Sequence, residues 1–342
     1  MAHPRLRAAV AAAAVIGGGV LAATNAVAAI PLPAHVFAPY LETWTGDSIS
    51  TLAQQSGVRQ FTLAFLETTS KSSCTLGWNG SKTETIASGR YLSEIASLRT
   101  GGGDVIPSFG GWSADQGGKE IGDSCKDVNA IAAAYESVVT TYGVTRLDMD
   151  IEGRSLTKPA GIDRRNKAIA MLQAWAAQNG RTVQVQYTLP TSANGLGSSE
   201  LAVLQNAVTN GVRIDLVNPM VFDYYDRVTT EMGGAAVAAS QGLHAQLATL
   251  YPAKTNAQLL AMQGLTMMNG VDDYPKRTEV TDLADAQQLL TFAQQKGMSA
   301  LSIWAIQRDN GSCAGGGAAN NCSGIAQGTW AFSHLLSPFT GA

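Results

Sequence analysis

Strand-like and helix-like stretches alternate along most of this chain, and that alternation restricts its fold more than any other feature. The strand-like stretches are short, apolar and rich in β-branched or aromatic residues. They cover residues 35–40, 60–66, 104–109, 145–151, 182–189, 216–222, 265–269 and 300–306. Between them, apolar residues recur at helical spacing, as at Val128, Ile131, Ala132 and Tyr135. Eight such units predict an α/β fold in which a parallel sheet closes into a (β/α)8 TIM barrel.

The rival architecture is an open, doubly wound sheet. Such a sheet usually has a glycine-rich turn after its first strand, whereas this chain reads APYLETW there. No Pro/Ser/Thr-rich linker and no internal repeat divides the sequence, so residues 29–342 are predicted to form a single domain. In a barrel the chemistry lies at the carboxyl ends of the strands, and candidate residues are sought there.

Residues 1–28 are predicted to be a secretory signal peptide. Arg5 and Arg7 precede an alanine-rich apolar run, and Ala26-Val27-Ala28 has the small-x-small form of a signal peptidase site. The apolar run is too short for a membrane span, so we expect a secreted, extracellular chain without a membrane partner. Without the two arginines, 21 basic residues face 26 acidic ones, a net charge of −5 that argues against nucleic acid as a partner.

Four cysteines are predicted to form disulfides, because an exported chain with an even number of cysteines favours them. The alternative is a metal site, but no C-x-x-C pair or nearby histidine cluster supports one, and no metal is expected. Four cysteines allow three pairings. We favour Cys74–Cys125 and Cys313–Cys322, because each pair would join or close loops at one end of the fold.

The segment VTRLDMDIEG, residues 144–153, carries acids at every second position. Alternate side chains of a strand share a face, so Asp148, Asp150 and Glu152 point the same way. In a barrel they would line the interior, where three carboxylates cannot all be ionised and at least one pKa must rise. The result is a protonated carboxylic acid at the barrel mouth, which a general acid must be.

Two other interpretations of this segment are weaker. A calcium loop needs a bidentate glutamate at its twelfth position, which here is Pro159, and the residues before the acids are strand-like rather than helical. A solvated edge strand would alternate charges in the same way. Both faces of a strand inside a βαβ series are covered, however, which argues against an edge strand.

These acids resemble the strand-four motif D-x-x-D-x-D-x-E of glycoside hydrolase family 18, the chitinases and their relatives. Asp148, Asp150 and Glu152 match its last three positions, and Thr145 stands at the first. NPMVFDYYD resembles the strand-six motif M-x-Y-D of the same family. Met220 and Asp223 match this second motif, and Phe222 replaces its tyrosine. Either Tyr224 or Tyr225 would supply the missing hydroxyl.

Three further segments resemble this family in the same order along the chain. PSFGGW is similar to the strand-three motif S-x-G-G, with Ser108, Gly110 and Gly111 matching, and its glycines let the backbone pass close beneath the acids. YTLP resembles the fifth strand. LSIWAIQRDN resembles strand eight, where Trp304 would form the floor under the sugar.

The resemblance implies a secreted chitinase that hydrolyses β-1,4-linked N-acetylglucosamine polymers with retention, using the substrate's own acetamido group as nucleophile. Glu152 would be the general acid and base, Asp150 would hold the acetamido N–H, and Asp148 would share a proton with Asp150. The expected partner is chitin or N-acetylglucosamine oligosaccharides, bound by a monomer without a cofactor. The alternatives are an endo-β-N-acetylglucosaminidase acting on N-glycan cores and a non-catalytic sugar-binding protein, which typically lacks the terminal glutamate.

Several loop residues keep two interpretations. Trp44, Trp78 and Trp112 follow the first three strands, and each either extends a sugar cleft or packs a loop; Trp112 is taken as a candidate for substrate binding. Glu67 and Asp272 follow strands two and seven. They either touch substrate or are solvated.

Overall fold

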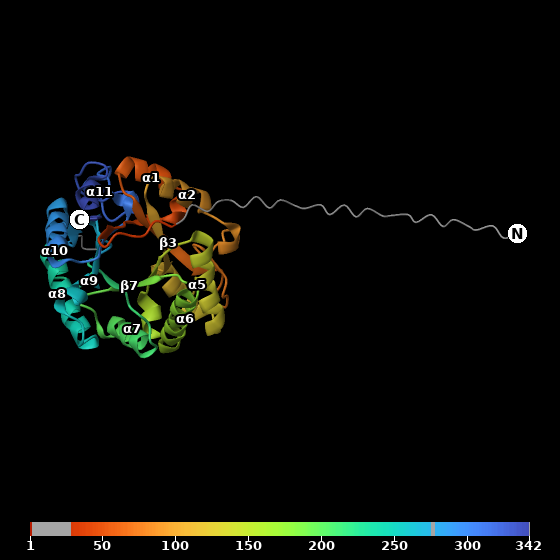
Figure 1. Ribbon diagram of the computed structural model, residues 1–342. Helices are drawn as coiled ribbons and strands as arrows, with labels where there is room; N and C mark the ends of the chain where they lie inside the picture. Colours follow the sequence, from red (N-terminus) through yellow and green to blue (C-terminus); the bar gives the residue numbers. More distant parts are fainter. Residues whose placement is uncertain (2–28, 275–277, 342) are drawn as a thin grey trace.

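A closed barrel of parallel strands, ringed by helices, forms the protein (Figure 1). The computed structural model describes residue 1 and residues 29–274 and 278–341. The predicted signal peptide therefore lies almost entirely outside the described residues. No helix in the described part of the chain combines the length and hydrophobicity needed to cross a bilayer.

The first stave of the barrel consists of two short strands, and through it the sheet closes. β1 (Val36–Phe37) pairs with the last strand, β12 (Ala300–Trp304), and β2 (Tyr40–Glu42) pairs with β3 (Gln60–Thr68). The other staves follow in chain order, all parallel: β5 (Asp104–Gly110), β6 (Arg146–Asp150), β7 (Gln184–Pro190), β8 (Leu216–Met220) and β9 (Gly264–Met268). The predicted barrel is confirmed.

Helices alternate with the staves and form the outer ring of Figure 1. The main ones are α1 (Ile49–Ser56), α2 (Leu92–Thr100), α5 (Val128–Tyr142), α6 (Pro159–Gln178), α7 (Ser198–Thr209), α8 (Met232–Leu250), α10 (Leu283–Lys296) and α11 (Ala331–Leu336). Shorter elements decorate the barrel: β4 (Leu76–Trp78), α3 (Trp112–Gly117), α4 (Ile121–Ser124), α9 (Asn256–Ala261) and the hairpin of β10 (Gly270–Val271) and β11 (Val280–Thr281). One large hydrophobic cluster packs the helices against the strands.

Helix α5 shows how local sequence sets these elements. Of its predicted apolar stripe, Ile131, Ala132 and Tyr135 are buried and Val128 is half-buried. The carboxylate of Asp127 caps its first turn by accepting hydrogen bonds from two backbone N–H groups. Gly143 ends the helix with a φ of 62°, a left-handed conformation that glycine adopts without strain.

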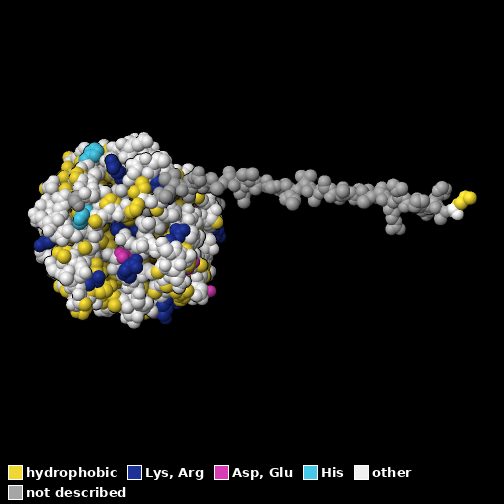
Figure 2. Space-filling view, viewed as in Figure 1, with side chains coloured by type: hydrophobic (Ala, Val, Ile, Leu, Met, Phe, Trp, Pro, Cys, Tyr) yellow, Lys and Arg dark blue, Asp and Glu magenta, His cyan; other side chains and the backbone are white. Residues whose placement is uncertain are grey.

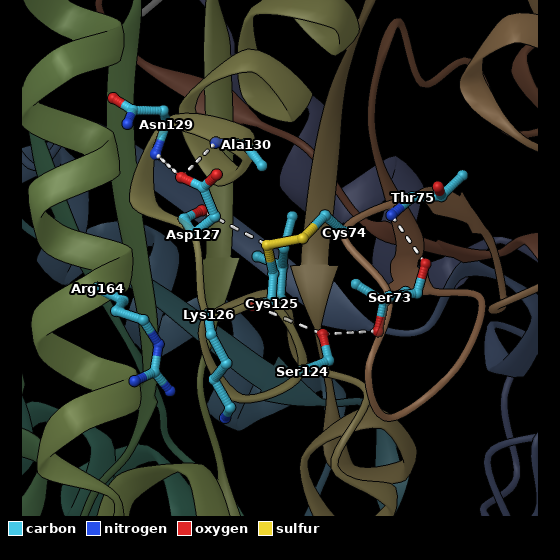
Figure 3. Close-up of a disulfide and its surroundings, with 12 residues drawn as sticks. Ser73, Cys74, Thr75, Ser124, Cys125, Lys126, Asp127, Asn129, Ala130 and Arg164 are labelled. Atoms are coloured by element: carbon cyan, nitrogen blue, oxygen red, sulfur yellow. Dashed lines mark hydrogen bonds between the residues drawn. A yellow bond between two sulfur atoms is a disulfide. The ribbon is translucent and has the colours of Figure 1, made fainter.

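Both predicted disulfides are confirmed. Cys74–Cys125 joins the loop after β3 to the end of α4, with the two Cα atoms 4.7 Å apart, and Figure 3 shows it next to the capped start of α5. Cys313–Cys322 closes a loop after β12. The face of the molecule in Figure 2 carries scattered Lys and Arg side chains without one continuous basic patch.

Candidate active site

The acidic column lies on β6 and at its carboxyl end. Asp148 and Asp150 are buried on the barrel interior, whereas Leu147 and Met149 pack into the hydrophobic cluster under the helices. The predicted alternation is therefore correct. β6 ends at Asp150, but Glu152 keeps an extended backbone, with φ −133° and ψ 174°, so it continues the same face two residues further.

Asp148 is the deepest acid of the column, and four side chains donate hydrogen bonds to it. The donors are the hydroxyls of Tyr40 and Ser108 on Oδ2, at 2.8 and 2.7 Å, and Thr188 and Gln186 on Oδ1, at 2.7 and 3.1 Å. Burial raises the pKa of Asp148, and these donors offset part of that rise. The saturated carboxyl group fixes the base of the column.

Asp150 and Glu152 form the reactive end of the column. Burial, followed by repulsion from Glu152, Asp148 and Asp115, raises the pKa of Asp150 far above its usual value. Burial raises the pKa of Glu152 to about 7, although the backbone N–H of Trp112 and a hydrogen bond from Asp150 favour its ionised form. The pair therefore holds a proton near neutral pH, as a general acid requires.

Two glycines after β5 bring the neighbouring backbone against this column. Gly110 has a φ of 100°, and a Cβ there would lie 2.1 Å from the carbonyl oxygen of Asp150. At Gly111, with φ 80°, a Cβ would lie 2.6 Å from the ring of Phe65. Only glycine fits either position.

A cavity of about 890 Å³ opens at the carboxyl ends of the strands, which is where barrel enzymes carry their chemistry. Its lining includes both reactive acids and most of the predicted substrate-binding residues: Asp150, Glu152, Trp112, Met220, Asp223, Tyr225 and Trp304. The complete lining draws on the strands of seven staves, all except β5, which contributes through Trp112 at the start of α3.

Aromatic rings form one wall of the cavity. Trp304 stacks on Phe65 with ring centroids 5.6 Å apart and planes 15° from parallel, and Tyr40 lies 5.6 Å from the same indole. Trp44 stacks on Phe65 with ring centroids 6.3 Å apart and lies at the same distance from Trp304. Trp44 and Trp112 are 46% and 59% exposed and line the cavity, as cleft residues would. Stacked rings suit the apolar faces of a pyranose.

The two tyrosines after β8 take different places. Tyr225 is 52% exposed and lines the cavity. Tyr224 is absent from the cavity lining; it packs beside Met220 and Phe222 in a small hydrophobic cluster, and among the described residues its hydroxyl has no hydrogen-bond partner. The expectation that Tyr224 contacts substrate therefore has no support from its position. Burial and nearby acids raise the pKa of Asp223, which also lines the cavity, to about 8.

The positions of Trp78, Glu67 and Asp272 decide between the two interpretations that each residue had. Trp78 is fully buried, and its indole N–H donates to the hydroxyl of Tyr142 at 2.9 Å, so it packs a loop. Glu67 lines the cavity. Asp272 is buried outside the lining and accepts a hydrogen bond from the backbone N–H of Asp223, so it is neither solvated nor a wall of the cavity.

The sequence profile of glycosyl hydrolases family 18 matches residues 36–282, from the first stave to the start of α10. The chain belongs to this family.

Two curated relatives are similar over most of the chain. A probable bifunctional chitinase/lysozyme from Escherichia coli (strain K12) is 33% identical over 325 residues, which make up 90% of this chain and 35% of the relative. Endochitinase 11 from Metarhizium anisopliae is 34% identical over 287 residues, 81% of this chain and 53% of the relative. The present chain spans about half or less of the length of these two relatives.

Solved structures agree with the barrel. The catalytic domain of a hyperthermophilic chitinase from Pyrococcus furiosus has a TM-score of 0.79 and 31% identity, covering 91% of this chain and 96% of that one. Catalytic-site mutants of active domain 2 of the Pyrococcus furiosus thermostable chitinase, complexed with chito-oligosaccharides, give a TM-score of 0.80 at 30% identity over the same shares.

Sequence reasoning missed part of the family 18 site. Phe65 and Asn320 line the cavity, and neither lies in a motif that identifies it. Asp115 is buried on α3 and accepts a hydrogen bond from the backbone N–H of Glu152. Asp115 lies 37 residues before Glu152 in the chain, and no periodic pattern connects the two positions.

Proposed function

We propose that this family 18 chain is a chitinase, which cleaves β-1,4-linked N-acetylglucosamine polymers through retaining, substrate-assisted catalysis. The observation that carries the proposal is Glu152, a carboxyl group with a pKa of about 7 on the wall of an aromatic-lined cavity. The chitinase descriptions of the relatives support the same substrate class.

In the first step, protonated Glu152 donates its proton to the glycosidic oxygen as the bond to the anomeric carbon breaks. The carbonyl oxygen of the 2-acetamido group attacks that carbon from the opposite face, so no second carboxylate is needed as nucleophile. The products are the released sugar, which leaves with the proton, and a cyclic oxazolinium ion.

The other acids would bind and orient the acetamido group of the substrate. Asp150 faces the cavity next to Glu152, and its carboxyl oxygen would accept a hydrogen bond from the acetamido N–H, which orients the carbonyl oxygen. Asp148 would share a proton with Asp150 and keep the column in place through its four donors. Asp223 and Tyr225 would complete the acetamido pocket from the opposite wall.

In the second step, ionised Glu152 takes a proton from water, and the resulting hydroxide oxygen bonds to the anomeric carbon as the oxazolinium ring opens. Two displacements restore the original anomeric configuration. Stacking on Trp304 would hold the sugar at this position throughout, because an indole face matches the C–H face of a pyranose.

A panel of substrates tests this function. The protein should release reducing sugar from colloidal chitin and from N-acetylglucosamine oligomers. Inactivity on chitin together with trimming of a high-mannose glycoprotein would favour an endo-β-N-acetylglucosaminidase. Sugar affinity without hydrolysis of either substrate would favour a non-catalytic binding protein.

We further propose that the chain is exported and acts as a monomer. The basic residues, apolar run and small-x-small site of residues 1–28 support export, as do the two disulfides. N-terminal sequencing of protein from the culture medium should begin at Ala29, and a chain retained in the cell with its first residues intact would contradict export.

A further inference from the structure

Helix α3 holds Glu152 from two sides. The backbone N–H of Trp112, the first residue of α3, interacts with the carboxylate of Glu152 and favours its ionised form. One turn later, Oδ2 of Asp115 accepts a hydrogen bond from the backbone N–H of Glu152. α3 therefore binds both the side chain and the main chain of the same residue.

We infer that Asp115 is a positioning residue for Glu152: its carboxyl group fixes the backbone from which the proton donor projects into the cavity. The inference rests on the proposed function, because it assigns Asp115 a part in the reaction of Glu152. Asp115 itself is absent from the cavity lining, so it acts through Glu152 and does not touch the sugar.

The main chain of Glu152 has two different partners: its N–H donates to Asp115, whereas its carbonyl oxygen accepts from the backbone N–H of Ser155 at 3.0 Å. β6 ends at Asp150, and the next residue after Glu152 is Gly153, with a φ of 43°. A Cβ at Gly153 would lie 2.5 Å from the side-chain amide of Gln116, so α3 also packs directly against the turn after Glu152. Without the carboxyl group of Asp115, the N–H of Glu152 would lose its partner between a strand end and a turn.

The contacts of Asp115 are directed to Glu152 and not to a cap of its own helix. The side chain is fully buried, and among the described residues its Oδ1 has no hydrogen-bond partner. The start of α3 has no side-chain cap, so Asp115 performs no capping of its own helix. Burying such a group is unfavourable unless it has a specific partner, and the partner in the structure is Glu152.

A buried ion pair lies near Asp115, and its two members act on the pKa of that acid in opposite directions. Arg165 of α6 bonds both carboxylate oxygens of Glu120, at 3.0 and 2.9 Å, and both residues are buried. Repulsion from Glu120 adds to burial in raising the pKa of Asp115, while Arg165 partly offsets it. Since the bond to Glu152 needs an acceptor oxygen and not a charge, asparagine can replace Asp115 in this role.

Steady-state hydrolysis of a chitin oligomer by two variants tests the inference. Asp115→Ala should lower kcat about 100-fold, the loss that a small misplacement of a catalytic group produces, with KM within about threefold of wild type. Asp115→Asn should recover most of that loss. Retention of kcat within about threefold in Asp115→Ala, or equal losses in both variants, would overturn the inference.

Asp123 offers a matched structural control. It is a buried acid on α4 that binds the far side of the same turn, through the hydroxyl of Ser155 at 2.6 Å and the ammonium of Lys158 at 2.9 Å. Asp123→Ala should lower the melting temperature while kcat stays within about threefold of wild type. A kcat loss in this control equal to that of Asp115→Ala would mean that any loosening of the turn suffices, which contradicts a specific role for Asp115.

A crystal structure of Asp115→Ala gives a readout that does not need hydrolysis. The backbone of Glu152 should shift, and its carboxylate should leave the N–H of Trp112. An unmoved Glu152 would overturn the inference whatever the substrate is. Failure of the wild-type protein to cleave chitin would contradict the proposed function alone, because the displacement of Glu152 could still be measured.

Discussion

Glu42, at the end of β2, allows a quantitative test of how burial sets proton binding in this barrel. Its side chain is fully buried, and among the described residues neither carboxylate oxygen has a hydrogen-bond partner. Burial raises its pKa from 4.5 to about 7, even though the guanidinium of Arg308 acts in the opposite direction. The folded protein therefore keeps a proton that the unfolded chain releases at lower pH.

The sign and size of the effect follow from linkage. Between about pH 4.5 and pH 7 the folded state binds more protons at this site than the unfolded state, so the free energy of unfolding falls as pH rises. At about 1.36 kcal/mol for each pKa unit, the shift contributes a loss of about 3 kcal/mol, complete above pH 7. Glutamine has the same shape and does not ionise, so Glu42→Gln should avoid that loss.

Urea unfolding of both proteins at about pH 4 and pH 8, followed by tryptophan fluorescence, measures the effect. Relative to wild type, Glu42→Gln should gain about 3 kcal/mol of stability between the two pH values, because every other titrating group is shared and cancels. A stability difference that is the same at both pH values would refute the reasoning.

Two further predictions concern the column itself. The kcat/KM for a chitin oligomer should fall as pH rises through about 7, because Glu152 must be protonated to donate its proton. A pH–rate profile measures this, and an activity that is constant from pH 6 to 9 would contradict it. Gly110→Ala should lower the free energy of unfolding by about 3 kcal/mol or more and displace Asp150, as its Cβ meets that backbone. Gly57→Ala, with a similar φ of 75° and no neighbour within 4 Å, is the control and should lose only about 1 kcal/mol.

Elements whose apolar residues repeat regularly in the sequence could be predicted. The alternation of acidic and apolar residues in VTRLDMDIEG predicted which side chains of β6 face the barrel interior, and the helical spacing of apolar residues predicted α5. The first stave could not be predicted in detail, because its division into β1 and β2 depends on two different neighbours that the chain reaches only when the barrel closes.

The parts of the site that lie outside regular strands and helices could not be predicted, because no repeating sequence pattern marks them. After β8 the backbone takes positive φ at Asp223 and Tyr225, 50° and 53°, so strand alternation no longer tells which tyrosine faces the cavity. Asp115 reaches Glu152 through the tertiary arrangement of α3 beside β6, a contact that local spacing does not encode. The unmatched Thr145 begins the predicted strand but precedes β6, which starts at Arg146 and ends at Asp150.

The most direct test of the central claim is the hydrolysis of chitin oligomers by Glu152→Gln. Glutamine keeps the shape of the side chain and cannot donate a carboxyl proton, so kcat should fall by about 100- to 10,000-fold. The affinity for the oligomer should stay within about threefold of wild type, because the aromatic wall and Asp150 remain in place. Hydrolysis at the wild-type rate by this variant would contradict the account.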